Sequence, residues 1–425
     1  MMRTDIKLGR EGYQITELGE IPLHWKINTL GDLIKIRSGA SPSKIKGLKE
    51  IGTYPFYKVN DLNFTRKYLR KAIYNFDDLN FQEIKKDTII FPKRGASIFT
   101  NKVAIISNPG YMDTNLMALE IVDNSILDHE YLYYLLSFRG LVEFADTSSI
   151  PQINNKHIEP IKIAIPPLKE QKKIADILST VDDQIENINH LITKIKELKK
   201  GLMQKLLTKG IGHTEFKNTD LGEIPLSWEL KTLGDISLVL DPQPDHRAPK
   251  IDMLNGIPYI GIGDISNNGE INFEKARQVT KKALDKQMER FMIEDGDIVF
   301  GKIASLGNPR KLKSFLNSRP YAISDKLVLI KSEIKDYLYF ALQSKYVEKQ
   351  IDFNKNGSTR YTLGIQNLRE FKIIIPPISE QQNITRILSS VDDQIENYER
   401  KKQKYIELKK GFMQQLLTGK IRVTV

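Results

Sequence analysis

The sequence predicts an α+β protein in which two pseudo-symmetric globular heads are joined by two long antiparallel helices that form a coiled coil. Three observations lead to this prediction. A stretch of 43 residues from Pro166 recurs without a gap from Pro376, and 26 of the 43 positions are identical. Both copies place apolar residues at alternating spacings of four and three, which is typical of a coiled-coil seam. The segments before the two copies also match each other, so the chain is a repeat of head and helix.

Domain boundaries follow from the repeat. The segment Leu18–Asp32, LGEIPLHWKINTLGD, is matched by LGEIPLSWELKTLGD at Leu221–Asp235, and each contains one of the two tryptophans. We expect Trp25 and Trp228 to anchor the cores of the heads. The predicted domains are a first head over 1–165, a first helix over 166–210, a second head over 211–375 and a second helix over 376–425.

Each predicted helix begins at a double proline, since proline is tolerated in the first turn of a helix but not in its interior. Glu170 follows in the first turn, where the helix dipole favours an anion. Roughly 40 residues make a helix of about 60 Å. The second helix covers the apolar seam of the first only by running back, so we expect an antiparallel pair. The seam positions are Ile174, Leu178, Val181, Ile185, Ile188, Ile192 and Ile195, then Ile384, Leu388, Val391, Ile395, Tyr398 and Tyr405.

The two heads are predicted to share an α+β framework and to differ in detail. Short β-branched runs bounded by Gly, Pro and Asn indicate strands, and runs such as 128–139 indicate short helices. Asp87–Lys93 aligns with Gly296–Lys302, and Ser148–Pro167 aligns with Ser358–Pro377. The helices are far more alike than the heads. A duplicated scaffold with two divergent heads suits a protein that recognises two different targets.

Composition restricts the class of protein. The net charge is +11 and is spread over heads and helices alike, which suits a polyanionic partner, although a lysine-rich soluble protein would show the same charge. The chain has no cysteine, which excludes disulfides and thiolate metal sites. It has no run of 18 apolar residues and no signal peptide, so we expect a cytoplasmic protein without a membrane partner.

No catalytic motif is found. The sequence lacks a phosphate-binding GxxxxGK[ST] loop and a glycine-rich loop for S-adenosylmethionine, and its six histidines are scattered without ligand spacing. We therefore expect no metal site and no cofactor in this chain.

Candidate nucleic-acid contacts are polar or cationic side chains in the predicted loops of both heads. Arg and Lys bind guanine edges, Asn binds adenine, and Ser and Tyr contact phosphates. The candidates are Ser41, Ser43, Lys44, Lys46, Lys58, Asn60, Lys93 and Arg94 in the first head, and Lys302, Arg310, Lys311, Lys313, Arg360 and Tyr361 in the second.

A second group of candidates lies on the helices and repeats at the same offset. Each copy has three acidic residues on a single helical face. Each copy also has a glycine inside the helix, where glycine costs about 1 kcal/mol relative to alanine. Carboxylates also bind hard cations, but a solvated or partner-facing surface explains the trios without a metal. The glycines indicate close approach of another helix, from this chain or from a partner. These candidate partner-binding residues are Asp182, Asp183, Glu186, Gly201, Asp392, Asp393, Glu396 and Gly411.

With these residues in view, the chain resembles the specificity subunit of Type I restriction–modification enzymes over essentially its full length. The motifs that carry the resemblance are GEIPLHW and GEIPLSW, two IPP-x-x-EQ helix starts, VDDQIEN twice, and LKKGLMQKLLT with LKKGFMQQLLT. One departure is visible. The first head has SGASPSK at Ser38–Lys44, whereas the second has LDPQPDHRAPK at Leu240–Lys250, and the role of that second loop is left open.

The resemblance implies two target recognition domains that each bind one half of a bipartite, asymmetric site in double-stranded DNA. It implies that the helices set the spacing and dock two methyltransferase subunits, and that restriction subunits complete the complex. S-adenosylmethionine, ATP and Mg²⁺ would then belong to the partner subunits. Two alternatives are a self-contained DNA methyltransferase or nuclease, against which the missing cofactor loop argues, and a structural coiled-coil scaffold, against which the two large heads argue.

Overall fold

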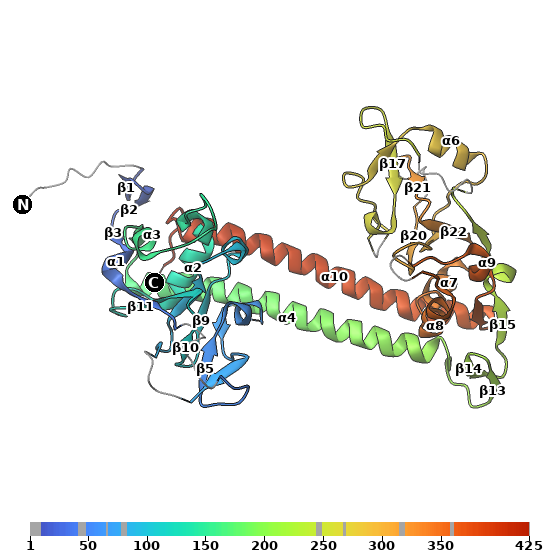
Figure 1. Cartoon of the computed structure of the whole chain (residues 1–425), viewed down its shortest axis with the longest axis horizontal. Helices are drawn as coiled ribbons and strands as arrows, with labels where there is room; N and C mark the ends of the chain where they lie inside the picture. Colours follow the sequence, from blue (N-terminus) through green and yellow to red (C-terminus); the bar gives the residue numbers. More distant parts are fainter. Residues whose placement is uncertain are drawn as a thin grey trace, which may run out of the picture. The chain divides into compact units, whose positions relative to one another are not determined.

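The computed structural model describes residues 10–40, 48–64, 67–77, 83–243, 249–266, 269–313, 319–357 and 361–424. The chain divides into two compact units, Met1–Ile188 with Lys401–Val425, and Asn189–Arg400. Both long helices, α4 (Leu168–Leu206) and α10 (Ile378–Leu416), contribute to both units (Figure 1). Each unit therefore contains one head, the first part of one long helix and the last part of the other. The boundaries that the sequence predicts for four separate domains stay a prediction.

The first head is built on a five-stranded sheet and a three-stranded sheet, with two strand pairs beside them. The five-stranded sheet has the order β4-β11-β8-β9-β6, and the three-stranded sheet has the order β10-β5-β7. The strands are β1 (Tyr13–Thr16), β2 (Gly19–Pro22), β3 (Lys26–Thr29), β4 (Ile34–Ser38), β5 (Tyr54–Tyr57), β6 (Tyr68–Leu69), β7 (Tyr74–Phe76), β8 (Ile89–Pro92), β9 (Ala104–Ile106), β10 (Tyr111–Met112), β11 (Leu116–Ile121) and β12 (Lys162–Ile165). The helices are α1 (Leu30–Leu33), α2 (His129–Arg139) and α3 (Asn155–Ile158), with 3-10 turns at Val59–Phe64, Ala96–Thr100 and Leu141–Phe144.

The second head repeats this framework with additions. Its larger sheet has the order β16-β22-β19-β20, and its smaller sheet has the order β18-β17-β21. The strands are β13 (Phe216–Thr219), β14 (Gly222–Pro225), β15 (Glu229–Thr232), β16 (Leu238–Leu240), β17 (Ile257–Ile260), β18 (Arg277–Val279), β19 (Ile298–Gly301), β20 (Gly307–Lys311), β21 (Ala322–Ile323), β22 (Leu327–Lys331) and β23 (Lys372–Ile375). The helices are α5 (Leu233–Ile236), α6 (Lys282–Met288), α7 (Lys335–Ala341), α8 (Lys345–Asn354) and α9 (Ile365–Arg369), with a 3-10 turn at Ile262–Asp264.

The central strands of both heads are apolar because both of their faces are covered. Every residue of β8 and of its counterpart β19 is buried. In each head the equivalent short helix, α2 or α7, packs a run of buried aromatic and leucine side chains into the core. The mixed α+β class predicted from the sequence is confirmed.

The long helices bury most of the predicted seam, whereas Ile195, Ile395 and Tyr405 are half-buried. On α4 the residues from Ile174 to Ile192 at the seam positions are at most 8% exposed. On α10, Ile384, Leu388 and Val391 are buried, whereas Tyr398 is half-buried. In the first unit the start of α4 packs beside the end of α10 at Leu416, and in the second unit the start of α10 packs beside the end of α4 at Leu206. The two helices therefore pack in opposite directions, as predicted.

Two equivalent ion pairs join the helices, one in each unit. The Nζ atom of Lys409 lies 2.7 Å from Oδ1 of Asp182, and Nζ of Lys199 lies 2.6 Å from Oδ1 of Asp392. Each lysine also lies over an aromatic ring of the head, Tyr134 at 5.4 Å in the first unit and Phe340 at 5.6 Å in the second. Because both pairs involve the same repeat positions, each helix offers the other the same face.

A buried glutamate at the start of α4 ties the first head to the end of α10. Glu170 is 1% exposed and accepts a hydrogen bond from Trp25 Nε1 at 3.3 Å. The guanidinium of Arg422, which follows α10, donates two hydrogen bonds to this carboxylate at 3.1 and 3.0 Å. The next residue, Gln171, donates to the carbonyl oxygen of Pro166 at 2.9 Å. The Pro-Pro-x-x-Glu-Gln motif therefore attaches the helix start to its head.

The second unit has an equivalent junction in which a histidine takes the place of the arginine. Glu380 accepts a hydrogen bond from Trp228 Nε1 at 2.8 Å, and Nε2 of His213 lies 2.9 Å from Oε1 of Glu380. His213 belongs to the segment that follows α4, as Arg422 belongs to the segment that follows α10. Gly210 precedes it with φ +65°, and a Cβ atom there would lie 2.5 Å from both Glu380 Oε1 and the Trp228 ring. The junction therefore requires glycine at this position.

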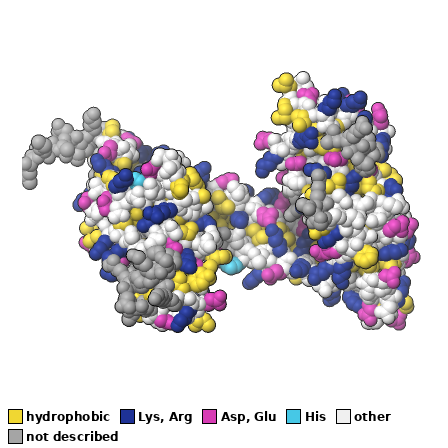
Figure 2. Space-filling model, viewed as in Figure 1, with side chains coloured by type: hydrophobic (Ala, Val, Ile, Leu, Met, Phe, Trp, Pro, Cys, Tyr) yellow, Lys and Arg dark blue, Asp and Glu magenta, His cyan; other side chains and the backbone are white. Residues whose placement is uncertain are grey.

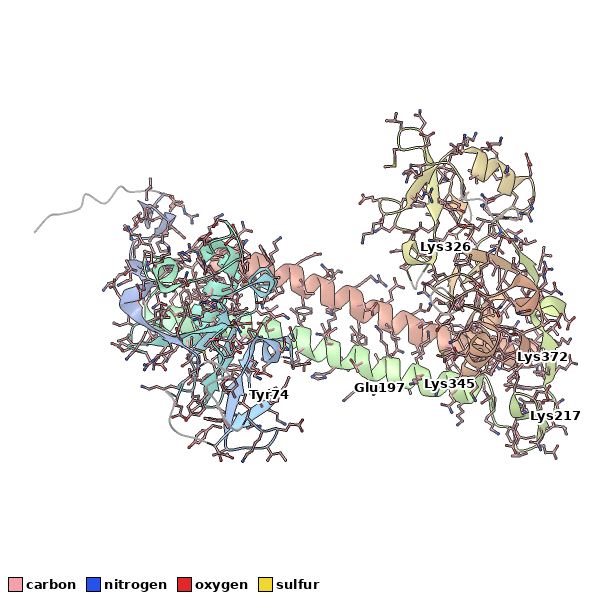
Figure 3. The ribbon with its side chains drawn as sticks, in the orientation of Figure 1. Tyr74, Glu197, Lys217, Lys326, Lys345 and Lys372 are labelled. Carbon is pink, nitrogen blue, oxygen red and sulfur yellow. The ribbon has the colours of Figure 1, made fainter. Side chains whose placement is uncertain are left out.

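Replacing the buried glutamate tests the first junction. Glu170→Ala leaves Arg422 and Trp25 without their acceptor, and breaking a buried ion pair costs about 3–5 kcal/mol. Arg422 is 38% exposed at its side chain, so we expect a loss near the lower limit, about 3 kcal/mol, in the free energy of unfolding. Urea unfolding followed by tryptophan fluorescence measures it. Glu197→Ala, at an exposed position of the same helix (Figure 3), is the control and should change stability by less than about 0.5 kcal/mol. An equal, small effect of both substitutions would contradict the assigned role.

Candidate functional site

Five loop ends of the first head meet at one edge of its sheets. Backbone hydrogen bonds connect them: Asp113 N–H donates to Tyr57 O, Ala40 N–H to Met112 O, and Lys93 N–H to Asn115 O, each at 2.9 Å. Ile153 N–H donates to Lys93 O at 2.9 Å, and Gly95 N–H donates to Pro151 O at 2.8 Å. We call this set the first loop edge: 38–40, 57–60, 93–95, 113–115 and 151–153.

The second head builds an equivalent edge with four of these five backbone hydrogen bonds. Ser324 N–H donates to Ile260 O and Lys302 N–H donates to Lys326 O, both at 2.9 Å. Leu363 N–H donates to Lys302 O, and Ala304 N–H donates to Tyr361 O, both at 2.8 Å. We call this set the second loop edge: 241–243, 260–261, 302–304, 324–326 and 361–363. Lys302 and Lys93 thus occupy one backbone position in the two heads.

The turn after this lysine is left-handed in both heads. Gly95 has φ +75° and Ala304 has φ +64°. Only glycine adopts a positive φ without cost, so Ala304 is strained by about 1–2 kcal/mol. Backbone strain of this kind concentrates at functional sites. The second head keeps the turn despite its cost, which identifies the loop edge as the part of each head whose shape is under constraint.

Lys93 and Arg94 lie together on the first loop edge. Arg94 is exposed and its backbone bridges to Gln152. Lys93 is half-buried, and its Nζ atom lies 3.5 Å from Ser38 Oγ. Burial, with a further contribution from the adjacent Arg94, lowers the pKa of the Lys93 ammonium, while Asp113 acts in the opposite direction. The edge therefore carries two positive charges side by side.

Lys302 forms an ion pair inside the second head. Its side chain is 5% exposed and its Nζ atom lies 2.9 Å from Oδ2 of Asp241. The expectation that Lys302 contacts DNA stays a prediction, and it has to account for a charge that is already paired with a carboxylate. Asp241 belongs to the divergent loop Leu240–Lys250, whose role the sequence left open, and its backbone carbonyl also accepts a hydrogen bond from Arg290 at 2.7 Å. Lys302 and Arg290 thus hold Asp241 at the start of this loop.

Three other expected contacts lie on the loop edges. Lys58 lies over the ring of Tyr74, which is labelled in Figure 3, with its Nζ atom 3.9 Å from the centroid. Asn60 is exposed. On the second edge Tyr361 is 40% exposed, and Lys355 Nζ lies 4.8 Å from its ring centroid.

The strand β20 carries the remaining described candidates of the second head. Lys311 Nζ lies 2.6 Å from Asp336 Oδ1, so an acidic group already neutralises its charge. Arg310 donates to the carbonyl oxygens of Ile265 and Pro309, and Lys313 is exposed. The candidates Ser41, Ser43, Lys44, Lys46 and Arg360 lie outside the described residues.

The helix candidates divide into internal and exposed groups. Asp182 and Asp392 form the ion pairs between the helices, so their side chains are turned toward the sister helix. Asp183 and Asp393 are exposed, as is Glu186, while Glu396 lies 3.7 Å from Arg400. A Cβ atom at Gly201 or at Gly411 would meet nothing within 4 Å. Of the two explanations for these glycines, close approach of the sister helix is therefore not observed.

The charges and hollows of the surface add no enzymatic site. On the face shown in Figure 2, Lys and Arg side chains are interspersed with Asp and Glu over both units. Within the described residues no group of three His, Asp or Glu side chains could hold a metal ion. The helices in those same parts of the chain are too short or too polar to cross a membrane.

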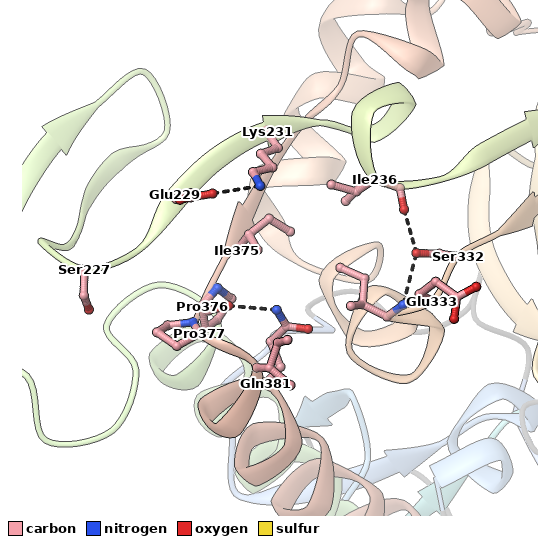
Figure 4. A pocket seen from close by; sticks show the side chains of 12 residues that line it. Ser227, Glu229, Lys231, Ile236, Ser332, Glu333, Ile375, Pro376, Pro377 and Gln381 are labelled. Atoms are coloured by element: carbon pink, nitrogen blue, oxygen red, sulfur yellow. Dashed lines mark hydrogen bonds and ion pairs between the residues drawn. The ribbon is translucent and has the colours of Figure 1, made fainter.

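One cavity of about 490 Å³ lies where β23 leads into α10 (Figure 4). Two of its polar side chains bond to neighbouring groups of the protein. Ser332 Oγ donates to Ile236 O at 2.7 Å and accepts from Ile334 N–H, and Gln381 donates to Pro376 O at 2.8 Å. The Gln381 contact holds the helix start in place.

Sequence reasoning missed several residues that matter here. Glu170 and Glu380 were expected at helix starts, but their partners Arg422 and His213 were not, since those contacts join segments far apart in the chain. Asp241 and Ser38 align at the 203-residue offset of the head repeat. That alignment marks them as equivalent, but only the fold places both beside the equivalent lysines.

Comparison with known proteins gives a consistent result. The profile of the family described as "Type I restriction modification DNA specificity domain" matches residues 22–197 and 225–408. The specificity subunits of the type I restriction enzymes MjaVIII and MjaIX of Methanocaldococcus jannaschii are 31% and 27% identical to this chain. The matches cover 95% of this chain and 94% of MjaVIII, and 97% of this chain and 96% of MjaIX.

Solved structures support the fold. The S subunit of the type I restriction–modification system from M. genitalium superposes with a TM-score of 0.54 at 16% identity, over 97% of this chain and 98% of that one. A chain from a structure concerning complex assembly and conformational transition of the type I R-M system gives 0.57 at 14% identity, over 94% and 99%.

The left-handed turn gives a paired stability test. Ala304→Gly removes the strain of a positive φ, so we expect the free energy of unfolding to rise by about 0.5–1 kcal/mol after the flexibility of glycine is subtracted. Gly95→Ala at the equivalent turn introduces the strain and should cost about 1–3 kcal/mol. No atom lies within 4 Å of a Cβ at Gly95, so steric contact does not contribute. Calorimetric unfolding of both variants is the measurement, and a loss of stability in Ala304→Gly would contradict the assignment.

Proposed function

Because this chain belongs to the Type I restriction modification DNA specificity family, and is the non-catalytic specificity subunit of a restriction enzyme complex, we propose that each head binds one half of a bipartite, asymmetric DNA site. The observation that carries this proposal is the pair of loop edges. Four equivalent backbone hydrogen bonds build both edges, while the side chains on the edges differ. One scaffold with two different recognition edges is what two unlike half-sites require.

The loop edges supply the chemistry for DNA binding. On the first edge Lys93, Arg94, Lys58 and Asn60 combine charge for phosphates with groups that bind base edges. On the second edge Tyr361 is accessible, with Arg310 and Lys313 on and after β20. Phosphate contacts set position on the duplex, whereas base contacts set sequence preference.

The helices have two further roles in this proposal. They set the distance between the half-sites, and they dock two methyltransferase subunits. Asp183 and Asp393 are exposed at equivalent positions, and Gly201 and Gly411 leave open space on the helix surface into which a partner helix could fit. Restriction subunits complete the complex. This family typically binds no cofactor, so S-adenosylmethionine, ATP and Mg²⁺ act on the partner subunits.

Exchange of one head tests the recognition model. Residues 34–158 can be replaced by the equivalent segment of another family member, which keeps the β3–β12 pair and the Trp25–Glu170 junction of this chain. In complex with its methyltransferase subunits, the hybrid should methylate a site with one new half and one native half. Sequencing of methylated bases in host DNA is the measurement. If both halves of the site change together, the two-head model is wrong.

Lengthening the helices tests their spacing role. One heptad inserted after Leu191 and another after Lys401, which are repeat-equivalent positions, keeps the seam in register and adds about 10 Å to each helix. The gap between the half-sites should widen by roughly three base pairs at about 3.4 Å each. Insertion after Leu191 alone is the matched control and should impair folding or binding, since the seams then lose register. An unchanged gap in the double insertion would show that the helices do not set the spacing.

A further inference from the structure

The two heads place different groups beside the same lysine. Lys93 and Lys302 are equivalent because they form the same backbone hydrogen bonds. The N–H of each donates to the turn before β11 or β22, and the carbonyl oxygen of each accepts from the loop at 151–153 or 361–363. Strand β4 in the first head and strand β16 in the second head end beside this lysine. The residue next to the lysine occupies the same repeat position in both heads. That residue is Ser38 in the first head, with Oγ 3.5 Å from Lys93 Nζ, and Asp241 in the second, with Oδ2 2.9 Å from Lys302 Nζ.

This difference reverses the electrostatics of the two edges. In the second head a carboxylate neutralises the lysine inside the protein, where both side chains are nearly buried. In the first head a serine hydroxyl takes the place of the carboxylate. Among the described residues Lys93 forms no ion pair, and Asp113 supplies only a longer-range attraction. A half-buried cation without a counter-ion is costly, and an anionic ligand relieves that cost.

The second head has a cation at a neighbouring position instead. The turn residue whose carbonyl oxygen accepts the lysine N–H is Asn115 in the first head and Lys326 in the second. Lys326 is exposed (Figure 3), whereas Lys302 beneath it is 4% exposed. The accessible positive charge therefore lies at the end of the central strand in the first head and in the adjacent turn in the second head.

We propose, on the basis of the DNA-binding function inferred above, that Lys93 binds a DNA phosphate in the first head, whereas Asp241 withholds Lys302 in the second head and exposed Lys326 makes the phosphate contact there. A phosphate suits Lys93 better than a base edge, since an ammonium group is a compact point charge and lacks the planar fork with which arginine binds guanine. Arg94 beside it is free to approach a base while Lys93 holds the backbone.

The salt dependence of DNA binding tests the first head. The full chain in complex with its methyltransferase subunits is titrated with a DNA duplex over a range of KCl concentrations. The duplex carries the sequence that this complex methylates. Each phosphate contact contributes about −0.9 to the slope of log K against log salt. Lys93→Met and Ser38→Asp should each make the slope less negative by about 0.9, so that a fourfold rise in salt weakens the variants about 3.5-fold less than the native complex.

Matched variants separate charge from shape. Ser38→Asn has the size of the aspartate without its charge and should keep the native slope, as should Lys93→Arg, which keeps the charge. The double variant Ser38→Asp with Lys93→Met should lose no more than either single variant, because both act on one contact. If Ser38→Asp does not fold, the comparison of Lys93→Met with Lys93→Arg decides the question alone.

The second head gives the reverse result. Replacing both members of the buried pair, Asp241→Asn with Lys302→Met, should keep the native slope, whereas Lys326→Met should make the slope less negative by about 0.9. A native slope in both Lys93→Met and Lys326→Met, or a change of sequence preference without a change of slope, would overturn the inference. Failure of the DNA-binding proposal itself is distinguishable, because the native complex would then show no preference for its own site over unrelated duplex DNA.

Discussion

The structure depends on a paired carboxylate at the start of each long helix, which is buried at Glu170 and partly buried at Glu380. A carboxylate that is nearly inaccessible to water must be paired, since an unpaired buried charge is strongly destabilising. Glu170 takes its partners from Trp25 of the head and Arg422 after α10, and Glu380 takes Trp228 and His213. Satisfying each glutamate therefore brings together the beginning of a head, the start of one helix and the segment that follows the other helix. This requirement determines the antiparallel direction within each unit.

The pairing of the helices is reciprocal because their sequences are nearly the same. The ion pairs Asp182–Lys409 and Asp392–Lys199 are one interaction made twice, and both lysines rest on an aromatic ring of α2 or α7. Because the two contacts are equivalent, the pairing constrains both helices. A substitution at one position of the repeat alters only one of the two contacts. Asp182 and Asp392 serve this internal contact, whereas the neighbouring Asp183 and Asp393 are exposed.

The two heads differ from each other more than the helices do, and the difference is visible at their loop edges. The backbone of the edge is the same in both heads, including a left-handed turn that is glycine in one and a strained alanine in the other. The side chains on that backbone differ in charge, with Ser38 beside Lys93 and Asp241 beside Lys302. Constant backbone and variable side chains suit recognition of two unlike half-sites by one fold, in a subunit whose catalytic partners supply the chemistry.

The amino-acid sequence by itself determined the repeat, the two helices, the α+β class and the family, because each depends on local periodicity or on residues at constant offsets. It also identified the tryptophans and the seam positions that prove to be buried. Only the tertiary structure decided which charges are used internally. Lys302 and Lys93 look alike in the sequence, yet one is neutralised by Asp241 and the other is not. Arg422 and Glu170 lie 252 residues apart, so no local pattern connects them. Whether a charged side chain is available to a ligand depends on the groups that surround it, and folding brings those groups from distant parts of the chain.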